Sequence, residues 1–185
     1  MGERILASLF SATTARTAGF NSVDTGSLTS ASKLLTCVLM FIGGSPGSTA
    51  GGIKTTTIFI LVVSLWSGIT DRHKTAVFKR RFEDDAIKKA STVFTLNMFL
   101  AIFALFTILA ITDLSLSDVM FEVFSAIGTV GMTTGITRDL SSAARIIIMV
   151  LMFCGRVGSL SFALTFLQGK KDPPVYYPEE EISVG

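Results

Sequence analysis

The sequence predicts an all-α polytopic membrane protein, and two observations favour that fold class. Hydrophobic residues make up 49% of the chain, the mean hydropathy is +0.60, and only 16% of the residues are charged, whereas a soluble globular domain carries about 25% charged residues. Charge is also missing from long tracts, since Lys54 is the only charged residue between Leu34 and Gly68 and Arg156 the only one between Ile146 and Gln168. Tracts of this kind are typical of membrane-embedded helices.

The first part of the chain predicts a short helix, a loop and a broken helix. Residues 3–15 form a short, half-polar segment, and the turn-like RTAGFNSVDTG follows it. The apolar segments 28–42 and 58–69 come next, and each is shorter than the roughly 20 residues that a crossing helix needs. We expect them to be one helix that is broken by GGSPGSTAGGIKTTT, residues 43–57. Such a break is tolerated inside a membrane where it is buried in protein or lines a wet cavity.

The second part predicts a spanning helix, another short helix with its loop, and a final long helix. Residues 93–111 form an unbroken apolar run, long enough to span. The segment 118–127 is too short to cross and is followed by GTVGMTTGIT. The last apolar segment, residues 143–167, is interrupted by CGRVGS and leads into a polar tail.

The two turn-like loops indicate an internal repeat. ARTAGFNS aligns with IGTVGMTT, which pairs Thr17 with Thr129 and Gly19 with Gly131. Each loop follows a short helix and precedes a spanning or broken one, so the repeating unit ends in short helix, Thr-x-Gly loop and helix. We divide the chain accordingly into a first unit that lacks its first helix (1–69), a linker (70–85), a complete second unit (86–169) and a tail (170–185).

The basic residues predict the orientation in the membrane. Seven of the sixteen Lys and Arg residues lie between Asp71 and Lys89, and Lys170 and Lys171 begin the tail. Under the positive-inside rule the linker and the tail are cytoplasmic. Both Thr-x-Gly loops then lie towards the outer side of a multi-pass plasma-membrane protein.

The Thr-x-Gly loops suggest a cation pathway. The C-terminal end of a short helix carries about half a negative charge, which favours a cation just beyond it. Glycine permits positive φ, so that successive backbone carbonyls can turn towards one axis and replace the hydration shell of an ion. One such triplet is an ordinary turn, but two at matching places of a repeat predict an ion filter. No covalent chemistry and no covalent cofactor are expected, so the chain is not predicted to be an enzyme.

Two further features have alternative interpretations. Arg156 lies in the middle of an apolar segment, where a charge usually faces a cavity or a partner; it either pairs with backbone carbonyls or forms a positive barrier beside the ion path. The glycine-rich segment 43–57 either gates a pore or is a simple buried break in a helix. Arg156 can serve both of its roles at once.

Two other function classes remain to be tested. GSTAGGIKT is close to the phosphate-binding pattern G-x-x-x-x-G-K-[ST] of ATPases, but Ile53 separates Gly52 from Lys54, and no strand is predicted before it. A non-conducting helical scaffold, in which the glycine loops only pack, is the other alternative. Substitution of Lys54 would abolish nucleotide binding in an ATPase, and a scaffold would tolerate Gly19→Ala.

The motifs resemble the Trk/Ktr/HKT superfamily of potassium transporters, and most closely its KtrB-like membrane subunits. ARTAGFNSVD is similar to their third filter segment, GGSPGSTAGGIKTTT to the intramembrane loop of the third repeat, GTVGMTTG to the fourth filter segment and GRVGSLSFAL to the arginine-bearing last helix. In that family one chain has four helix, re-entrant pore loop, helix repeats around a single pore. The resemblance therefore implies the last part of repeat three and all of repeat four, which is the C-terminal half of a pore.

The resemblance also implies site residues and partners. Potassium would pass along filter carbonyls, above all at Gly19 and Gly131, and Arg156 would face the gate loop. The filter residues are Thr17, Ala18, Gly19, Phe20, Thr129, Val130, Gly131 and Met132. The gate-loop residues are Gly43, Gly44, Ser45, Pro46, Gly47, Ser48, Thr49, Ala50, Gly51, Gly52 and Lys54. The implied partners are membrane lipid, the missing N-terminal repeats or a complementary chain, a second copy in a homodimer and a cytoplasmic KtrA/TrkA-type nucleotide-binding regulatory subunit, with sodium as a coupling or stimulating ion and no nucleic acid.

Overall fold

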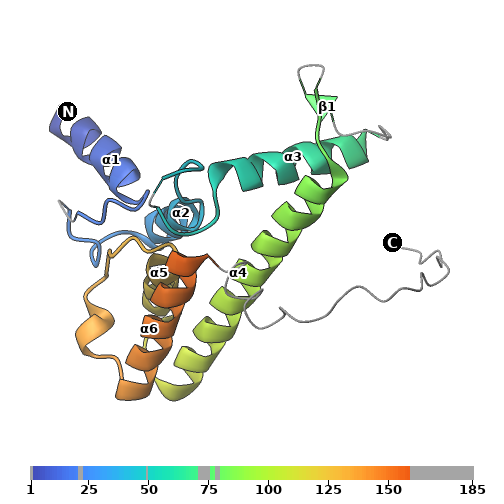
Figure 1. Ribbon diagram of the computed structural model, residues 1–185. Helices are drawn as coiled ribbons and strands as arrows, with labels where there is room; N and C mark the ends of the chain where they lie inside the picture. Colours follow the sequence, from blue (N-terminus) through green and yellow to red (C-terminus); the bar gives the residue numbers. More distant parts are fainter. Residues whose placement is uncertain (1, 21–22, 49, 71–75, 78–79, 159–185) are drawn as a thin grey trace, which may run out of the picture.

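A computed structural model describes residues 2–20, 23–48, 50–70, 76–77 and 80–158 (Figure 1). These residues form helices joined by loops, together with one small hairpin. The elements in chain order are α1 (Gly2–Thr14), α2 (Ser30–Phe41), α3 (Thr55–Ile69), β1 (Ala76–Val77), β2 (Arg80–Arg81), α4 (Asp84–Ile111), α5 (Leu116–Ile127), the 3-10 turn η1 (Ile136–Arg138) and α6 (Ser142–Val157).

Hydroxyl side chains mark the beginnings of three helices. Thr29, Ser115 and Ser141 precede α2, α5 and α6, and each side-chain oxygen accepts a hydrogen bond from the backbone N–H three residues further on. A cap of this kind satisfies one of the N–H groups that a helix leaves unpaired at its first turn. The observed bounds of the short helices α1 and α5, and of the interruption between α2 and α3, lie within a few residues of the expected ones.

The linker between α3 and α4 contains a short hairpin. Its described residues include a two-stranded antiparallel hairpin in which Ala76 pairs with Arg81 and Val77 with Arg80. α4 begins at Asp84, nine residues before the apolar run, because Asp84 and Asp85 in its first turn complement the positive end of the helix dipole. The last two residues of the expected linker, 70–85, therefore belong to α4.

The core of the described residues is built around α5. This short helix packs against α2, α4 and α6 (Figure 1), and seven of its twelve residues are buried. Small residues of α4, among them Ala101 and Ala104, allow the close approach of that long helix. The main buried cluster contains Phe41, Ile53, Ala101, Ala104, Ile108, Val119, Val123, Ala126, Ile127, Leu140, Ala144, Ile148 and Leu151.

The outward faces of the helices are apolar. α4 is long and apolar enough to cross a membrane, and only 22% of its spanning window is buried, unlike the core helix of a soluble protein. Large side chains such as Phe106 on α4 and Trp66 on α3 are exposed. α2 and α3 are shorter apolar helices, as two parts of a broken helix would be. The expected continuation of α6 to residue 167 lies outside the described residues, as does the tail.

Candidate functional site

The two Thr-x-Gly loops share one unusual backbone conformation. Thr17 has φ 65° and Gly19 φ 72°, and at the matching positions Thr129 has φ 53° and Gly131 φ 85°. A β-branched residue at positive φ is rare and strained, with a cost of about 1–3 kcal/mol. Among the residues that the structure describes, these threonines are the non-glycine residues with positive φ. The strain therefore marks the two segments that the sequence singles out.

Backbone N–H groups of both loops bond back to the helices that precede them. Ala18 and Gly19 donate to the carbonyl of Thr14 over 3.1 and 3.2 Å, and Val130 donates to the carbonyl of Ser125 over 2.9 Å. The Thr14 hydroxyl also bonds both backbone groups of Phe20, accepting from its N–H at 2.8 Å. These loop amides thus bind carbonyls in the last turns of α1 and α5, where each helix dipole has its negative end.

The two loops lie against each other. A Cβ on Gly19 would be 2.2 Å from the carbonyl oxygen of Val130, so only glycine fits at this contact. Thr25, downstream of the first loop, donates its hydroxyl to the carbonyl of Thr133, downstream of the second. A second buried cluster joins them and contains Ala15, Cys37, Met40, Phe121, Val130 and Met132. Of the eight predicted filter residues, Val130 and Met132 are buried, whereas Phe20 is 68% exposed.

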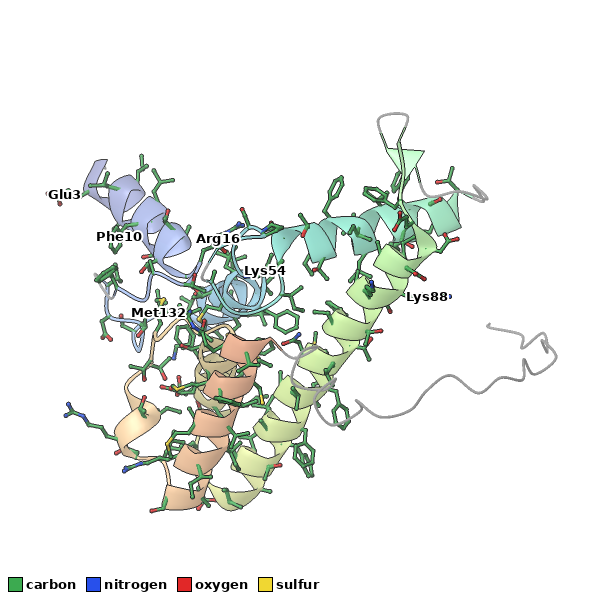
Figure 2. The ribbon with its side chains drawn as sticks, in the orientation of Figure 1. Glu3, Phe10, Arg16, Lys54, Lys88 and Met132 are labelled. Atoms are coloured by element: carbon green, nitrogen blue, oxygen red, sulfur yellow. The ribbon has the colours of Figure 1, made fainter. Side chains whose placement is uncertain are left out.

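The glycine-rich segment forms a loop that is closed at its neck. Gly43 donates to the carbonyl of Ile53 at 2.8 Å, and Ile53 donates to Phe41 at 3.1 Å, so the two arms run side by side. The Lys54 ammonium reaches back to the carbonyls of Ser48 and Ala50 and lies just before α3 (Figure 2). The described part of the loop thus binds its own lysine through backbone oxygens; Thr49 lies outside the described residues.

These contacts disagree with a phosphate-binding loop. A loop of that class follows a β-strand and opens its amides to an anion. Here α2 precedes the segment, and the Lys54 side chain is engaged by loop carbonyls. The arrangement does not support the ATPase alternative.

The returning arm of the glycine loop, close to its neck, touches the second Thr-x-Gly loop. Gly51 donates its N–H to the Thr129 hydroxyl at 3.1 Å, and a Cβ on Gly51 would lie 2.2 Å from that same oxygen. Gly52 approaches Gly128, whose Cα would be 3.4 Å from an added Cβ. The structure thus brings the expected gate loop to the expected filter, and glycines make the contact possible.

Arg156 is placed near this junction by its neighbour in α6. A Cβ on Gly155 would be 2.1 Å from the carbonyl oxygen of Ile127, at the end of α5 that carries the second loop. The Arg156 side chain itself is exposed in the described part of the chain. Its expected position facing the gate loop stays a prediction.

Sequence reasoning missed a buried carboxylate behind the second loop. Glu122 on α5 is 5% exposed, and its Oε1 accepts hydrogen bonds from the hydroxyls of Thr133 and, at 2.9 Å, Thr137. These threonines belong to the segment that leaves the loop. A signal was present, because Glu122 is the only charged residue between Val119 and Thr137, and a charge inside a membrane segment is a functional candidate.

An ion pair near the N-terminal ends of α2 and α5 was also missed. Lys33 on α2 donates to Asp118 on α5 at 2.8 Å, and Ser115 donates to the other carboxylate oxygen at 2.7 Å. The side chains of Lys33 and Asp118 are 10% and 23% exposed. The hydrogen bond from Lys33, followed by that from Ser115, holds the pKa of Asp118 below its ordinary value.

Removing one partner of this ion pair is expected to destabilise the protein. Lys33→Met leaves the partly exposed Asp118 without its cation, and the loss is expected to lie below the roughly 3–5 kcal/mol of a fully buried pair. Lys33→Met with Asp118→Asn is expected to recover much of it. Thermal unfolding of the detergent-purified single and double variants measures the loss and the recovery of stability. Because the Asp118 pKa is lowered, the contribution is present above the ordinary carboxyl pKa and is lost as pH falls through the lowered one. Equal stability of the single and double variants would contradict the prediction.

Comparisons with known proteins agree on one family. Residues 1–172 match the family model TrkH, described as a cation transport protein. The chain is 37% identical over 183 residues to the Ktr system potassium uptake protein B of Bacillus subtilis, and 37% identical over 190 residues to the potassium/sodium uptake protein NtpJ of Enterococcus hirae. These alignments cover 99% of this chain but 41% and 42% of the relatives.

A solved structure shows the same fold. The potassium transporter TrkH from Vibrio parahaemolyticus matches with a TM-score of 0.68 at 21% identity, over 88% of this chain and 36% of that one. The chain thus spans about two fifths of the length of the curated relatives and about a third of the solved one. The helices in Figure 1 therefore have the same arrangement as the matching part of a known membrane transporter.

Proposed function

Because this chain belongs to the TrkH family of cation transport proteins, we propose that it supplies two of the four filter segments of a potassium-uptake pore. The observation that carries the proposal is the shared left-handed conformation of Thr17 and Gly19, and of Thr129 and Gly131. Membership of a family of transport proteins also agrees with the expected absence of enzymatic chemistry. The membrane is the proposed location, with the linker and the tail on the cytoplasmic side.

The filter acts through backbone oxygens. Residues 17–20 and 129–132 each begin beyond the C-terminal end of a short helix, where the dipole favours a cation. Positive φ at alternate positions turns successive carbonyls to one side, where they replace the water around potassium. The N–H bonds to Thr14 and Ser125 support this arrangement, because they hold the loops to the ends of their helices.

The glycine loop acts as the gate. It touches the second filter segment through Gly51 and Thr129, which supports a place directly below the filter. Most of its residues carry small side chains, so rearrangement breaks few packing contacts, and the bonds of Gly43 and Ile53 keep its ends fixed while the residues between them move. Arg156, in the helix that packs at the end of α5, adds a positive barrier next to this path.

The complete transporter needs further chains or segments. Two filter segments do not close a four-part ring, so the missing half comes from the N-terminal repeats of a longer protein or from a complementary chain. By analogy with the Ktr-type proteins, we propose a homodimer with a cytoplasmic nucleotide-binding subunit of the KtrA/TrkA type. Sodium is a candidate coupling or stimulating ion, since one relative is a potassium/sodium uptake protein.

Potassium-limited growth and rubidium uptake test this function. A transporter-deficient bacterium expresses the chain alone, or together with the segment of the Bacillus subtilis relative that precedes the aligned part. We expect rescue only with the added segment. Rescue by the chain alone would mean that copies complete the filter. No rescue in either case, with the protein present in the membrane, would favour a non-conducting scaffold.

Glu122 is expected to support the selectivity of the second filter segment. Glu122→Leu removes the acceptor of the Thr133 and Thr137 hydroxyls, so the segment beyond Met132 loses its anchor. We expect a several-fold lower ratio of rubidium to sodium uptake, whereas Glu122→Gln keeps one acceptor oxygen and loses less. Asp113→Asn, at an exposed carboxylate before α5, is the control and should leave the ratio unchanged. An unchanged ratio in Glu122→Leu would contradict this role.

A further inference from the structure

The first Thr-x-Gly loop is fixed at its end by a side chain of its own short helix. The Thr14 hydroxyl accepts a hydrogen bond from the Phe20 N–H at 2.8 Å and donates one to the Phe20 carbonyl at 2.9 Å. At the spacing that pairs Thr17 with Thr129, Ala126 stands at the place of Thr14. Alanine has no hydroxyl for these bonds, so the second loop is not fixed in the same way.

Thr133 anchors the segment that leaves the second loop. It follows Met132 directly, and its hydroxyl donates to the buried Glu122 carboxylate and accepts from the Gly135 N–H at 2.9 Å. The backbone carbonyl of Thr133 accepts a further hydrogen bond from the Thr25 hydroxyl. The side chain of Thr133 is thus bound within the second unit, whereas its backbone oxygen is bound by a residue of the first.

Thr25 is buried although the chain around it is not. It is 4% exposed and is the only buried residue in the segment 23–30. Asp24 supports the turn that presents it, because the Asp24 side chain accepts from the Gly26 N–H at 3.0 Å. A Cβ on Gly26 would lie 3.1 Å from the Thr134 carbonyl oxygen. The segments that follow the two loops thus lie side by side (Figure 1), and one buried hydroxyl joins them.

We propose that Thr25 is a positioning residue for ion selectivity, whose hydroxyl sets the orientation of the proposed second filter segment from the first unit by holding the Thr133 carbonyl. This inference rests on the proposed function, since selectivity requires a conducting pore. The bond fixes the backbone directly after residues 129–132. Selectivity in a carbonyl filter depends on the size of the cavity or on the number and field of its carbonyl dipoles, and the orientation of one segment affects both.

Removal of the Thr25 hydroxyl tests the role in selectivity. Thr25→Val keeps the branched shape of threonine but leaves the Thr133 carbonyl without its donor, and an unsatisfied acceptor away from water is costly, so the segment turns towards another donor. We expect a several-fold lower ratio of rubidium to sodium uptake in cells that also express the complementary segment. Thr25→Ser keeps the hydroxyl and should retain the ratio.

Two further variants make the test specific. Thr36→Val is the same chemical change at a hydroxyl that donates within its own helix, to the Ser32 carbonyl at 2.8 Å, and it should leave the ratio unchanged. Thr25→Val combined with Glu122→Leu removes both anchors of Thr133, so the double variant should lose little more selectivity than the weaker single one. An unchanged ratio in Thr25→Val, an equal fall in Thr36→Val, or losses that multiply in the double variant would contradict the proposal.

Hydrogen–deuterium exchange separates this inference from the proposed function. In the detergent-purified chain, Thr25→Val should raise deuterium uptake in peptides that cover residues 129–135, and Thr36→Val should not. Unchanged exchange in Thr25→Val would overturn the positioning. Faster exchange with an unchanged uptake ratio would overturn the role in selectivity and leave the proposed function standing. Faster exchange in a chain whose wild type takes up no rubidium with the complementary segment would support the positioning and count against the proposed function.

Discussion

Replacing Gly19 by alanine is expected to lower rubidium uptake at least tenfold in cells that express the chain with the complementary segment. Two effects add at this position. Gly19 has φ 72°, and the left-handed conformation costs an L-residue roughly 1–2 kcal/mol. An alanine Cβ would also lie 2.2 Å from the Val130 carbonyl oxygen, so one Thr-x-Gly loop must move away from the other. A free-energy cost of about 1.4 kcal/mol lowers the population of the native loop conformation roughly tenfold. The strain and the displacement together are therefore sufficient for the expected loss of uptake.

The matching glycine separates the two effects. Gly131 has φ 85°, yet a Cβ there meets nothing within 4 Å, so Gly131→Ala introduces strain without a clash and should lose less uptake than Gly19→Ala. Gly68→Ala, in α3 with open space around it, should leave uptake unchanged. Wild-type uptake by Gly19→Ala at equal membrane abundance would show that the loops only pack, as in a scaffold.

Gly51→Ala is expected to raise resting cation flux several-fold. Its Cβ would lie 2.2 Å from Oγ1, 2.6 Å from Cγ2 and 2.9 Å from Cβ of Thr129, and rotation of the Thr129 side chain does not move the last of these atoms. This arm of the loop must therefore move away from the second Thr-x-Gly loop and lose the hydrogen bond from the Gly51 N–H. Rubidium efflux from loaded cells, without a potassium gradient that favours uptake, measures the flux.

A second substitution tests whether this contact is the cause. Thr129→Gly removes the side chain that alanine would meet, and glycine adopts the φ of 53° without strain. The double variant with Gly51→Ala should therefore have a lower resting flux than Gly51→Ala alone, close to that of Thr129→Gly alone, which lacks only the hydrogen bond from Gly51. Efflux that stays high in the double variant, or a single variant with unchanged efflux, would mean that the loop does not obstruct the path.

The sequence predicted the places of the main elements because apolar runs and glycine clusters depend on local composition. The short helices, the break between α2 and α3 and the two Thr-x-Gly loops could be read in this way. The positive φ of Thr17 and Thr129 could not be predicted from the sequence, because threonine normally avoids this conformation and only the surrounding structure imposes it. The pairing of Thr17 with Thr129 was available from the repeat, but its conformation was not.

Contacts between distant segments were the least predictable. Lys33 reads as an ordinary flanking cation and Asp118 as an ordinary helix-capping acid until the fold brings them together. The contact of Gly51 with Thr129 likewise joins segments that lie far apart in the chain. The hairpin of β1 and β2 had no sequence signal, since two-residue strands are too short to show alternation.

Lys54 of the glycine loop binds the same kind of backbone oxygen that a permeating cation would bind. The Lys54 ammonium is a monovalent cation held by backbone carbonyls, which is also how a dehydrated potassium ion is held. In the proposed pore, the Lys54 ammonium therefore occupies loop carbonyls as a potassium ion would, but it cannot diffuse away because it is part of the chain. Under the proposed function, a potassium ion that leaves the Thr-x-Gly loops meets carbonyl oxygens that already bind Lys54 and a charge of the same sign, so the glycine loop would oppose permeation by competition as well as by its bulk.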